Sequence, residues 1–175
     1  MSKMSRRIVV DASVVRAAGE TQHPTSSRCR EFLLDILLIC HRVVVSDDIM
    51  REWKKHASNY SLRWLAAMRS KGKIIHVVPA PSGLMVQIIE CAEWEEKEIA
   101  AMQKDLLLIL AALGADRIIA SGDTTVHDLF VRAAVTVDSI SSIVWVNPSR
   151  EEDHCGEWLT AGARHMQELT LGGAG

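Results

Sequence analysis

The sequence predicts a three-layer α/β/α sandwich with a central, mainly parallel sheet of five strands. Short runs of apolar, largely β-branched residues recur along the chain, and stretches with helical spacing separate them. This alternation is typical of a parallel sheet covered by helices on both faces, whose strands are continuous apolar runs. The chain has 175 residues, of which 48% are hydrophobic, which is enough for one compact domain.

The first half of the chain contains three of the expected strands, over residues 8–10, 42–45 and 73–78. Helices are expected between them, over residues 13–18, 28–40, 47–57 and 59–70. Gly19 closes the first helix, Ser46 is a suitable N-cap for the third, and Gly72 stops the fourth. Pro79 and Pro81 end the third strand, because proline cannot continue a sheet ladder.

The second half of the chain begins with a helical region that opens at Ser82 and becomes almost wholly apolar over residues 104–113. The remaining strands are expected over residues 117–120 and 143–146. A short helix is expected over residues 124–130, whereas 131–142 fits a strand, a helix or a loop.

The domain organisation follows from where these elements end. Residues 1–148 form one domain, and residues 149–175 form a C-terminal extension. We expect a helix on the outside over residues 150–168, followed by a disordered tail with the sequence LGGAG.

Composition limits the cellular setting and the partners. The net charge of −2 gives no general attraction to nucleic acid, so a polyanion would need a local basic patch or a metal. The four cysteines form no CxxC pair, which favours a reducing, cytoplasmic location. The longest apolar run, residues 106–115, is too short to cross a bilayer, and we expect no membrane partner.

Acidic side chains follow several of the predicted strands. Asp11 directly follows the first strand, and Asp123 comes shortly after the fourth, with Ser121 between. Glu52 lies one turn into the helix after the second strand, and Asp105 precedes the apolar run LLLILAALGA. Carboxylates that converge at one sheet edge repel one another unless a cation lies between them. Mg²⁺ or Mn²⁺ is the expected ion, because hard divalent cations prefer oxygen ligands.

Each acid also has a purely structural interpretation. Asp11 is a suitable N-cap for the helix that follows it, and Asp123 is a suitable turn residue after a glycine. Glu52 has Lys55 or His56 as partners one turn away on the same helix. Asp105 is a candidate for a favourable interaction with a helix dipole. These interpretations must together explain why acids recur at several strand ends of one sheet.

In this order, the segments resemble the PIN-domain family of metal-dependent ribonucleases. The matching segments are IVVDASVV, VVVSDDIMREW, KDLLLILAALGADRIIASGD, HDLF and the closing strand IVWVNP. The resemblance covers residues 6–148, so the domain over residues 1–148 is interpreted as a PIN-like nuclease domain.

The resemblance implies a catalytic site and a reaction. Asp11, Glu52, Asp105 and Asp123 would gather around one or two Mg²⁺ or Mn²⁺ ions, with Asp128 assisting or replacing the fourth acid. Ser13 and Ser121 match positions where the family often has a small hydroxyl residue near the site. The implied activity is hydrolysis of RNA phosphodiester bonds, either as the toxin of a toxin–antitoxin pair or as an RNA-processing nuclease.

A basic stretch beside Glu52 is the candidate RNA contact. Arg51, Lys54 and Lys55 belong to residues 51–73, which contain seven basic residues and one acid. A basic surface of this kind binds a phosphate backbone, although a solvated helix face explains the pattern equally well. The expected substrate is single-stranded or structured RNA, and the candidate protein partners are an antitoxin and a second copy of the chain.

Other classes of function leave different patterns. A PIN-like scaffold or nucleic-acid-binding module without catalytic activity stays open as an alternative. A Rossmann-like nucleotide-binding protein is disfavoured, because no strand is followed by GxGxxG or GxxxxGK[ST]. The spacing of His154, Cys155 and His165 fits no common zinc site.

Overall fold

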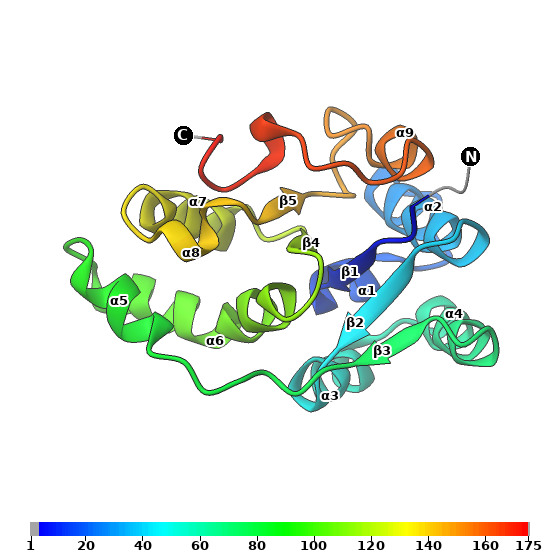
Figure 1. Ribbon diagram of the computed structural model, residues 1–175. Helices are drawn as coiled ribbons and strands as arrows, with labels where there is room; N and C mark the ends of the chain where they lie inside the picture. Colours follow the sequence, from blue (N-terminus) through cyan, green and yellow to red (C-terminus); the bar gives the residue numbers. More distant parts are fainter. Residues whose placement is uncertain (1–3, 175) are drawn as a thin grey trace.

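The computed structural model describes residues 4–174, which contain a five-stranded sheet with every pair of neighbours parallel (Figure 1). The predicted α/β sandwich is therefore confirmed, and the sheet is wholly rather than mainly parallel. The strand order is β3-β2-β1-β4-β5. The strands are β1 (Arg7–Val10), β2 (Arg42–Val45), β3 (Ile74–His76), β4 (Ile118–Ala120) and β5 (Val144–Val146).

Helices form a layer on each side of the sheet. One layer follows β1 and β2, and it contains α1 (Ala12–Ala17), α2 (Pro24–Leu38), α3 (Asp47–His56) and α4 (Asn59–Ser70). The other follows β3 and β4, and it contains α5 (Leu84–Glu90), α6 (Glu96–Leu113), α7 (Thr124–Ala134) and α8 (Asp138–Ser141). From β1 to β3 the chain moves across the sheet in one direction, and it then returns past β1 to β4 and β5. Because the crossovers are right-handed, this reversal places the two groups of helices on opposite faces of the sheet.

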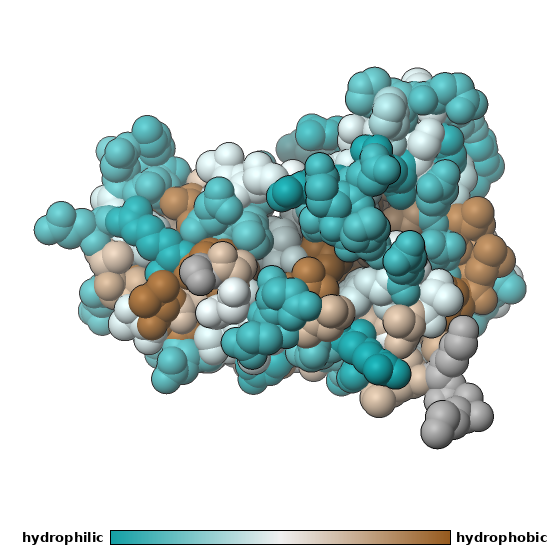
Figure 2. Space-filling view, turned by 90° about the horizontal axis from the view of Figure 1, so that it is seen from above, coloured by the Kyte–Doolittle hydropathy of each residue, from teal (hydrophilic) through white to brown (hydrophobic). Residues whose placement is uncertain are grey.

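The short apolar runs predicted as strands lie in the hydrophobic core. Residues 8–10 and 43–45 are wholly buried, as expected for strands covered on both faces. On the face seen in Figure 2, hydrophilic side chains predominate and hydrophobic ones form small, separate groups. No helix within residues 4–174 is both long and apolar enough to span a membrane.

Helix caps set several boundaries that hydrophobic spacing alone leaves vague. Ser46 caps α3 as predicted, because its Oγ accepts a hydrogen bond from the Ile49 amide at 3.3 Å. The side chains of Glu95 and Glu98 form a capping box that starts α6 at Glu96. Asp105 therefore lies nine residues inside the helix. The predicted dipole role for Asp105 is wrong, since that interaction is confined to the first turn.

The stretch over residues 131–142 is helical rather than extended. Helix α7 continues to Ala134, past the expected end at residue 130, and α8 follows after a short turn. These two helices complete the second layer and lead directly into β5.

The C-terminal extension differs from the prediction. The expected helix over residues 150–168 is instead α9 (Cys155–Thr160) and a 3₁₀ turn, η1 (Gln167–Leu169). His154 and Ala163 have positive φ values of 43° and 47°, which interrupt a continuous helix.

The tail is also not disordered as expected. Leu171 is wholly buried, and its amide donates to the Ile143 carbonyl at 2.9 Å. Residues 171–174 are therefore ordered parts of the fold, while Gly175 lies outside the described residues.

Lys73 joins the layer that contains α2 to the start of β3. Its side chain is 9% exposed, and its Nζ donates to the carbonyls of Ile36, Leu37 and Ile39 at the end of α2. The last turn of α2 has no basic residue of its own. A cation at a helix C-terminus satisfies free carbonyls and interacts favourably with the helix dipole.

We expect Lys73→Met to lower the free energy of unfolding by about 2 kcal/mol, because three carbonyls lose a charged donor while the aliphatic stem is kept. Urea unfolding followed by tryptophan fluorescence would measure the change. Lys71→Met is the matched control, because Lys71 is exposed at the end of α4 and should change stability by under about 0.5 kcal/mol. Equal losses in the two variants would contradict a capping role for Lys73.

Candidate functional site

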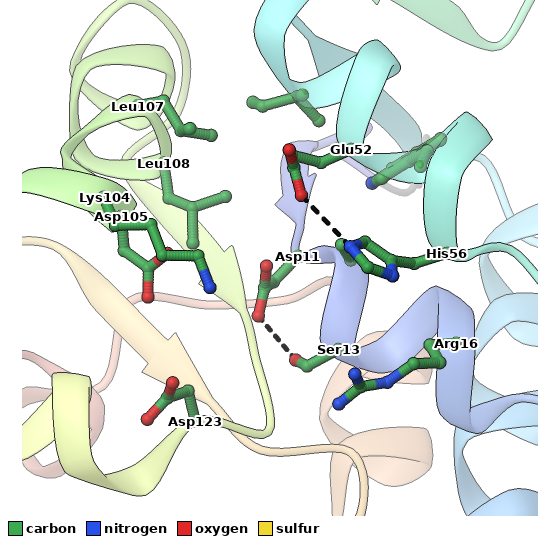
Figure 3. A pocket seen from close by; sticks show the side chains of 13 residues that line it. Asp11, Ser13, Arg16, Glu52, His56, Lys104, Asp105, Leu107, Leu108 and Asp123 are labelled. Atoms are coloured by element: carbon green, nitrogen blue, oxygen red, sulfur yellow. Dashed lines mark hydrogen bonds and ion pairs between the residues drawn. The ribbon is translucent and has the colours of Figure 1, made fainter. Parts of the chain in front are cut away.

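Four acids predicted from the sequence line one cavity of about 180 Å³ (Figure 3). Asp11 follows β1, Glu52 comes from α3, Asp105 from α6, and Asp123 from the loop before α7. The cavity lies at the carboxyl ends of β1 and β4, where the strand order reverses. In open α/β sheets, ligands bind in the crevice at this reversal.

The Asp11 carboxylate faces the cavity rather than capping a helix. Asp11 occupies the N-cap position of α1, but its side chain makes no capping hydrogen bond. Its Oδ2 instead accepts hydrogen bonds from Ser13 Oγ at 2.5 Å and Ser121 Oγ at 2.8 Å. The N-cap interpretation therefore describes the backbone of Asp11, and the two hydroxyls hold the carboxylate in place.

The same two serines join the loops that follow β1 and β4. Ser13 Oγ accepts a hydrogen bond from the Gly122 amide at 3.0 Å, and Ser121 Oγ accepts one from the Asp123 amide at 3.1 Å. Ser121 is almost wholly buried. Ser13 and Ser121 thus lie beside the carboxylates, at positions that fix the distance between Asp11 and Asp123.

Asp123, interpreted from the sequence as a turn residue or a site residue, is the N-cap of α7 and also lies at the site. Its Oδ1 accepts a hydrogen bond from the Val126 amide at 3.0 Å and caps α7. The residue also lines the cavity with Asp11. Capping therefore fixes the orientation of this carboxylate without removing it from the site.

Glu52 is paired within its own helix. Its Oε2 lies 3.4 Å from Nε2 of His56, one turn further along α3, and both side chains are about one-third exposed (36% and 33%). Both residues line the cavity. Of the two partners that the sequence suggested for Glu52, Lys55 and His56, the structure shows His56. Its imidazole is therefore part of the site.

Asp105 shows the electrostatic cost of this arrangement. The pKa of Asp105 is raised to about 6, mainly by burial and next by the charge of Asp11. Lys104 opposes this shift, and Asp123 and Glu52 add to it. No hydrogen bond or ion pair to the Asp105 carboxylate occurs within residues 4–174. The carboxylates are therefore close enough to repel one another.

The donor set suits a hard divalent cation. Four carboxylates supply oxygen ligands, and a bound ion would relieve the repulsion that raises the pKa of Asp105. Within the described part of the chain, no three His, Cys, Asp or Glu side chains form a compact metal-binding group. Mg²⁺ commonly has only one or two carboxylate ligands and keeps several waters, so it does not require such a group.

Three basic side chains at the cavity were not predicted from the sequence as parts of the site. They are Arg16, His56 and Lys104. Arg16 follows Ser13 by three residues on α1 and therefore shares its helix face, and Lys104 is adjacent to Asp105. The available signal was closeness in sequence to a predicted site residue, with helical spacing for Arg16 and His56 alone.

The basic residues that were predicted as RNA contacts lie elsewhere on α3. Arg51, Lys54 and Lys55 are exposed, and none of them lines the cavity. Arg51 pairs with Asp48 at 2.7 Å. Ile49, Glu52, Trp53 and His56 recur at helical spacing and line the cavity, so this stripe of α3 faces the site instead of Arg51, Lys54 and Lys55.

Asp128 is not brought together with the other four acids. Its side chain is 79% exposed and does not line the cavity. Its Oδ1 lies 2.9 Å from Nδ1 of His127, whose ring is 5.7 Å from that of Trp145. The geometry thus favours Asp123 over Asp128 as the fourth acid.

In comparisons with known proteins, no family model, no curated protein and no solved structure matches this chain.

We expect Asp105→Asn to stabilise the metal-free protein at pH 8 by about 1–2 kcal/mol, with no gain at pH 4. The pKa of Asp105 is raised from 3.8 to about 6, so the folded state binds this proton more tightly than the unfolded chain. The resulting stability is present below about pH 4 and is lost as pH rises through about 6. The magnitude is below that of the full shift because the group is partly solvated.

Thermal unfolding across pH in the presence of a chelator would measure this gain. Glu90→Gln is the control, because Glu90 is exposed on α5 and lies outside the cavity. Adding Mn²⁺ should stabilise the parent protein more than Asp105→Asn. A gain that does not depend on pH would rule out carboxylate repulsion as its cause.

Proposed function

We propose that this protein is a divalent-metal-dependent ribonuclease that hydrolyses RNA phosphodiester bonds. The observation that carries the proposal is the convergence of Asp11, Glu52, Asp105 and Asp123 on one cavity at the strand-order reversal. The order of these acids along the chain resembles that of PIN-domain nucleases, which supports the same conclusion independently of the cavity.

The carboxylates would hold Mg²⁺ or Mn²⁺, which lowers the pKa of a bound water and offsets charge on the phosphate. Water attacks the phosphorus, the bond from phosphorus to the 3′-oxygen breaks, and the 3′-oxygen takes up a proton. The products carry a 5′-phosphate and a 3′-hydroxyl.

The chain's own contribution is to hold the acids in place before substrate binds. Ser13 and Ser121 hold Asp11, and the cap to α7 holds Asp123. Asp105 is kept partly desolvated on the opposite wall, where electrostatic interactions are stronger than in water.

The biological setting is part of the proposal. The resemblance supports either a toxin of a toxin–antitoxin pair, inhibited by an antitoxin protein, or an RNA-processing nuclease. A cytoplasmic location agrees with the absence of a disulfide bond among the four cysteines, all of which lie within residues 4–174. A homodimer is the expected assembly if the toxin interpretation holds.

We expect the purified protein to cleave single-stranded RNA when Mn²⁺ or Mg²⁺ is added and to stop when a chelator is added. Asp11→Asn and Asp105→Asn should each reduce the rate by roughly 100-fold or more, because each removes a charged ligand from the site. A gel assay with end-labelled RNA would measure the rates, and circular dichroism would establish that both variants fold.

Asp123→Asn and Asp128→Asn separate the two candidates for the fourth acid. Asp123→Asn should lose activity, whereas Asp128→Asn should stay within a few-fold of the parent protein, because Asp128 lies outside the cavity. RNA binding without cleavage under all metal conditions would contradict the nuclease and favour a catalytically inactive nucleic-acid-binding module.

A further inference from the structure

We propose that Arg16 and Lys104 are substrate-binding residues that contact the two phosphates flanking the scissile one in a bound RNA strand. This inference rests on the proposed function, because it places the scissile phosphate at the four carboxylates. Arg16 and Lys104 belong to different layers of the fold, on α1 and α6. They line the same cavity from opposite walls (Figure 3).

Neither side chain forms a hydrogen bond or a close ion pair among the described residues, although the charge of Lys104 acts on Asp105. Arg16 and Lys104 are exposed, and no hydrogen bond or ion pair within residues 4–174 involves the guanidinium of Arg16 or the ammonium of Lys104. Several other surface arginines are already paired, since Arg28 contacts Glu151 and Arg63 contacts Glu20. Arg16 and Lys104 are therefore available to an anion from outside the chain.

Their place beside the carboxylates does not mean that they neutralise them. In Figure 3, Lys104 extends from α6 toward Asp11, and Arg16 lies beyond Ser13, away from Glu52. Lys104 lowers the pKa of Asp105 by less than burial and the charge of Asp11 raise it. The pKa of Asp105 therefore stays above its ordinary value despite the adjacent lysine. The two bases thus add positive charge on opposite sides of the cavity without returning the pKa of Asp105 to its ordinary value.

The chemistry of the ligand follows from this charge pattern. A ligand group that binds the cation must carry oxygen atoms and negative charge. The same ligand must also carry one anionic group for Arg16 and another for Lys104, one on each side of the first. A nucleic-acid strand has phosphates at regular intervals and satisfies both conditions. Arginine binds a phosphate through two parallel N–H donors, and lysine binds one as a point charge.

The first test measures RNA binding rather than cleavage. The affinity of a labelled single-stranded RNA would be measured by fluorescence anisotropy at several salt concentrations, in Ca²⁺ to suppress turnover. Arg16→Ala and Lys104→Ala should each weaken binding roughly tenfold. Each should also reduce the slope of log affinity against log salt by about 0.7, the value for one lost phosphate contact on a single strand.

Lys97→Ala and Arg164→Ala are the matched controls. Lys97 lies two turns before Lys104 on α6, and Arg164 is exposed outside the cavity. Both variants should keep the parent affinity and slope. Unchanged slopes in Arg16→Ala and Lys104→Ala, or equal losses in the controls, would overturn the inference whether or not the protein cuts RNA.

The second test places the two contacts on the substrate. After the cleavage position in a fixed RNA is mapped, one flanking phosphate at a time is replaced by a neutral methylphosphonate. Each replacement should lower kcat/KM of the parent protein about tenfold. Arg16→Ala should be insensitive to one replacement and Lys104→Ala to the other, and full sensitivity to both in each variant would refute the assignment. Absence of any cleavage by the parent protein would instead refute the proposed nuclease and leave the binding test to decide the inference.

Discussion

The parallel pairing of β1 with β4 places the loops that follow these strands side by side, although they are more than 100 residues apart in sequence. Val10 is opposite Ala120 in this pairing, and the Asp11 amide donates to the Ala120 carbonyl at 2.9 Å. Ser121 can then reach the Asp11 carboxylate. Every other feature of the cavity depends on this alignment, because a slip of one residue would turn the side chains of one strand to the opposite face relative to its neighbour.

Concentrating acids at this edge of the sheet opposes stability, and other interactions offset that cost. Trp53 packs in the core directly after Glu52, and its Nε1 donates to the Val10 carbonyl at 2.9 Å. The wall that carries Glu52 is thus bonded to the strand that carries Asp11. Sites that require like charges at close range commonly depend on a rigid surrounding scaffold of this kind.

Much of the fold and four of the site residues were predictable from the sequence, for identifiable reasons. Buried parallel strands are continuous apolar runs, so β1, β2 and β5 stood out, and polar residues after β1, β2 and β4 marked the site. Asp128 was wrongly included among the metal ligands, because closeness to a strand end in sequence does not show which side of the following helix a side chain occupies. The start of α6 depended on a reciprocal cap between two glutamates in a region already rich in acids.

Other features depend on tertiary contacts that a linear pattern does not contain. The bend at His154 uses a left-handed conformation that non-glycine residues seldom adopt. The burial of Leu171 depends on a partner, Ile143, that lies 28 residues earlier. Arg16 and Lys104 look like ordinary solvated bases until the topology brings α1 and α6 to the same cavity.

The packing of Leu171 against the sheet also bears on association with other molecules through the edge of the sheet. β5 is the last strand on one side of the sheet, and the outer backbone groups of such a strand are a template for pairing with another chain. Thr170 forms an antiparallel bridge with Val144, and the amide of Leu171 binds the Ile143 carbonyl. Residues 170–171 therefore cover the start of this edge strand and occupy backbone groups that could otherwise pair with another chain.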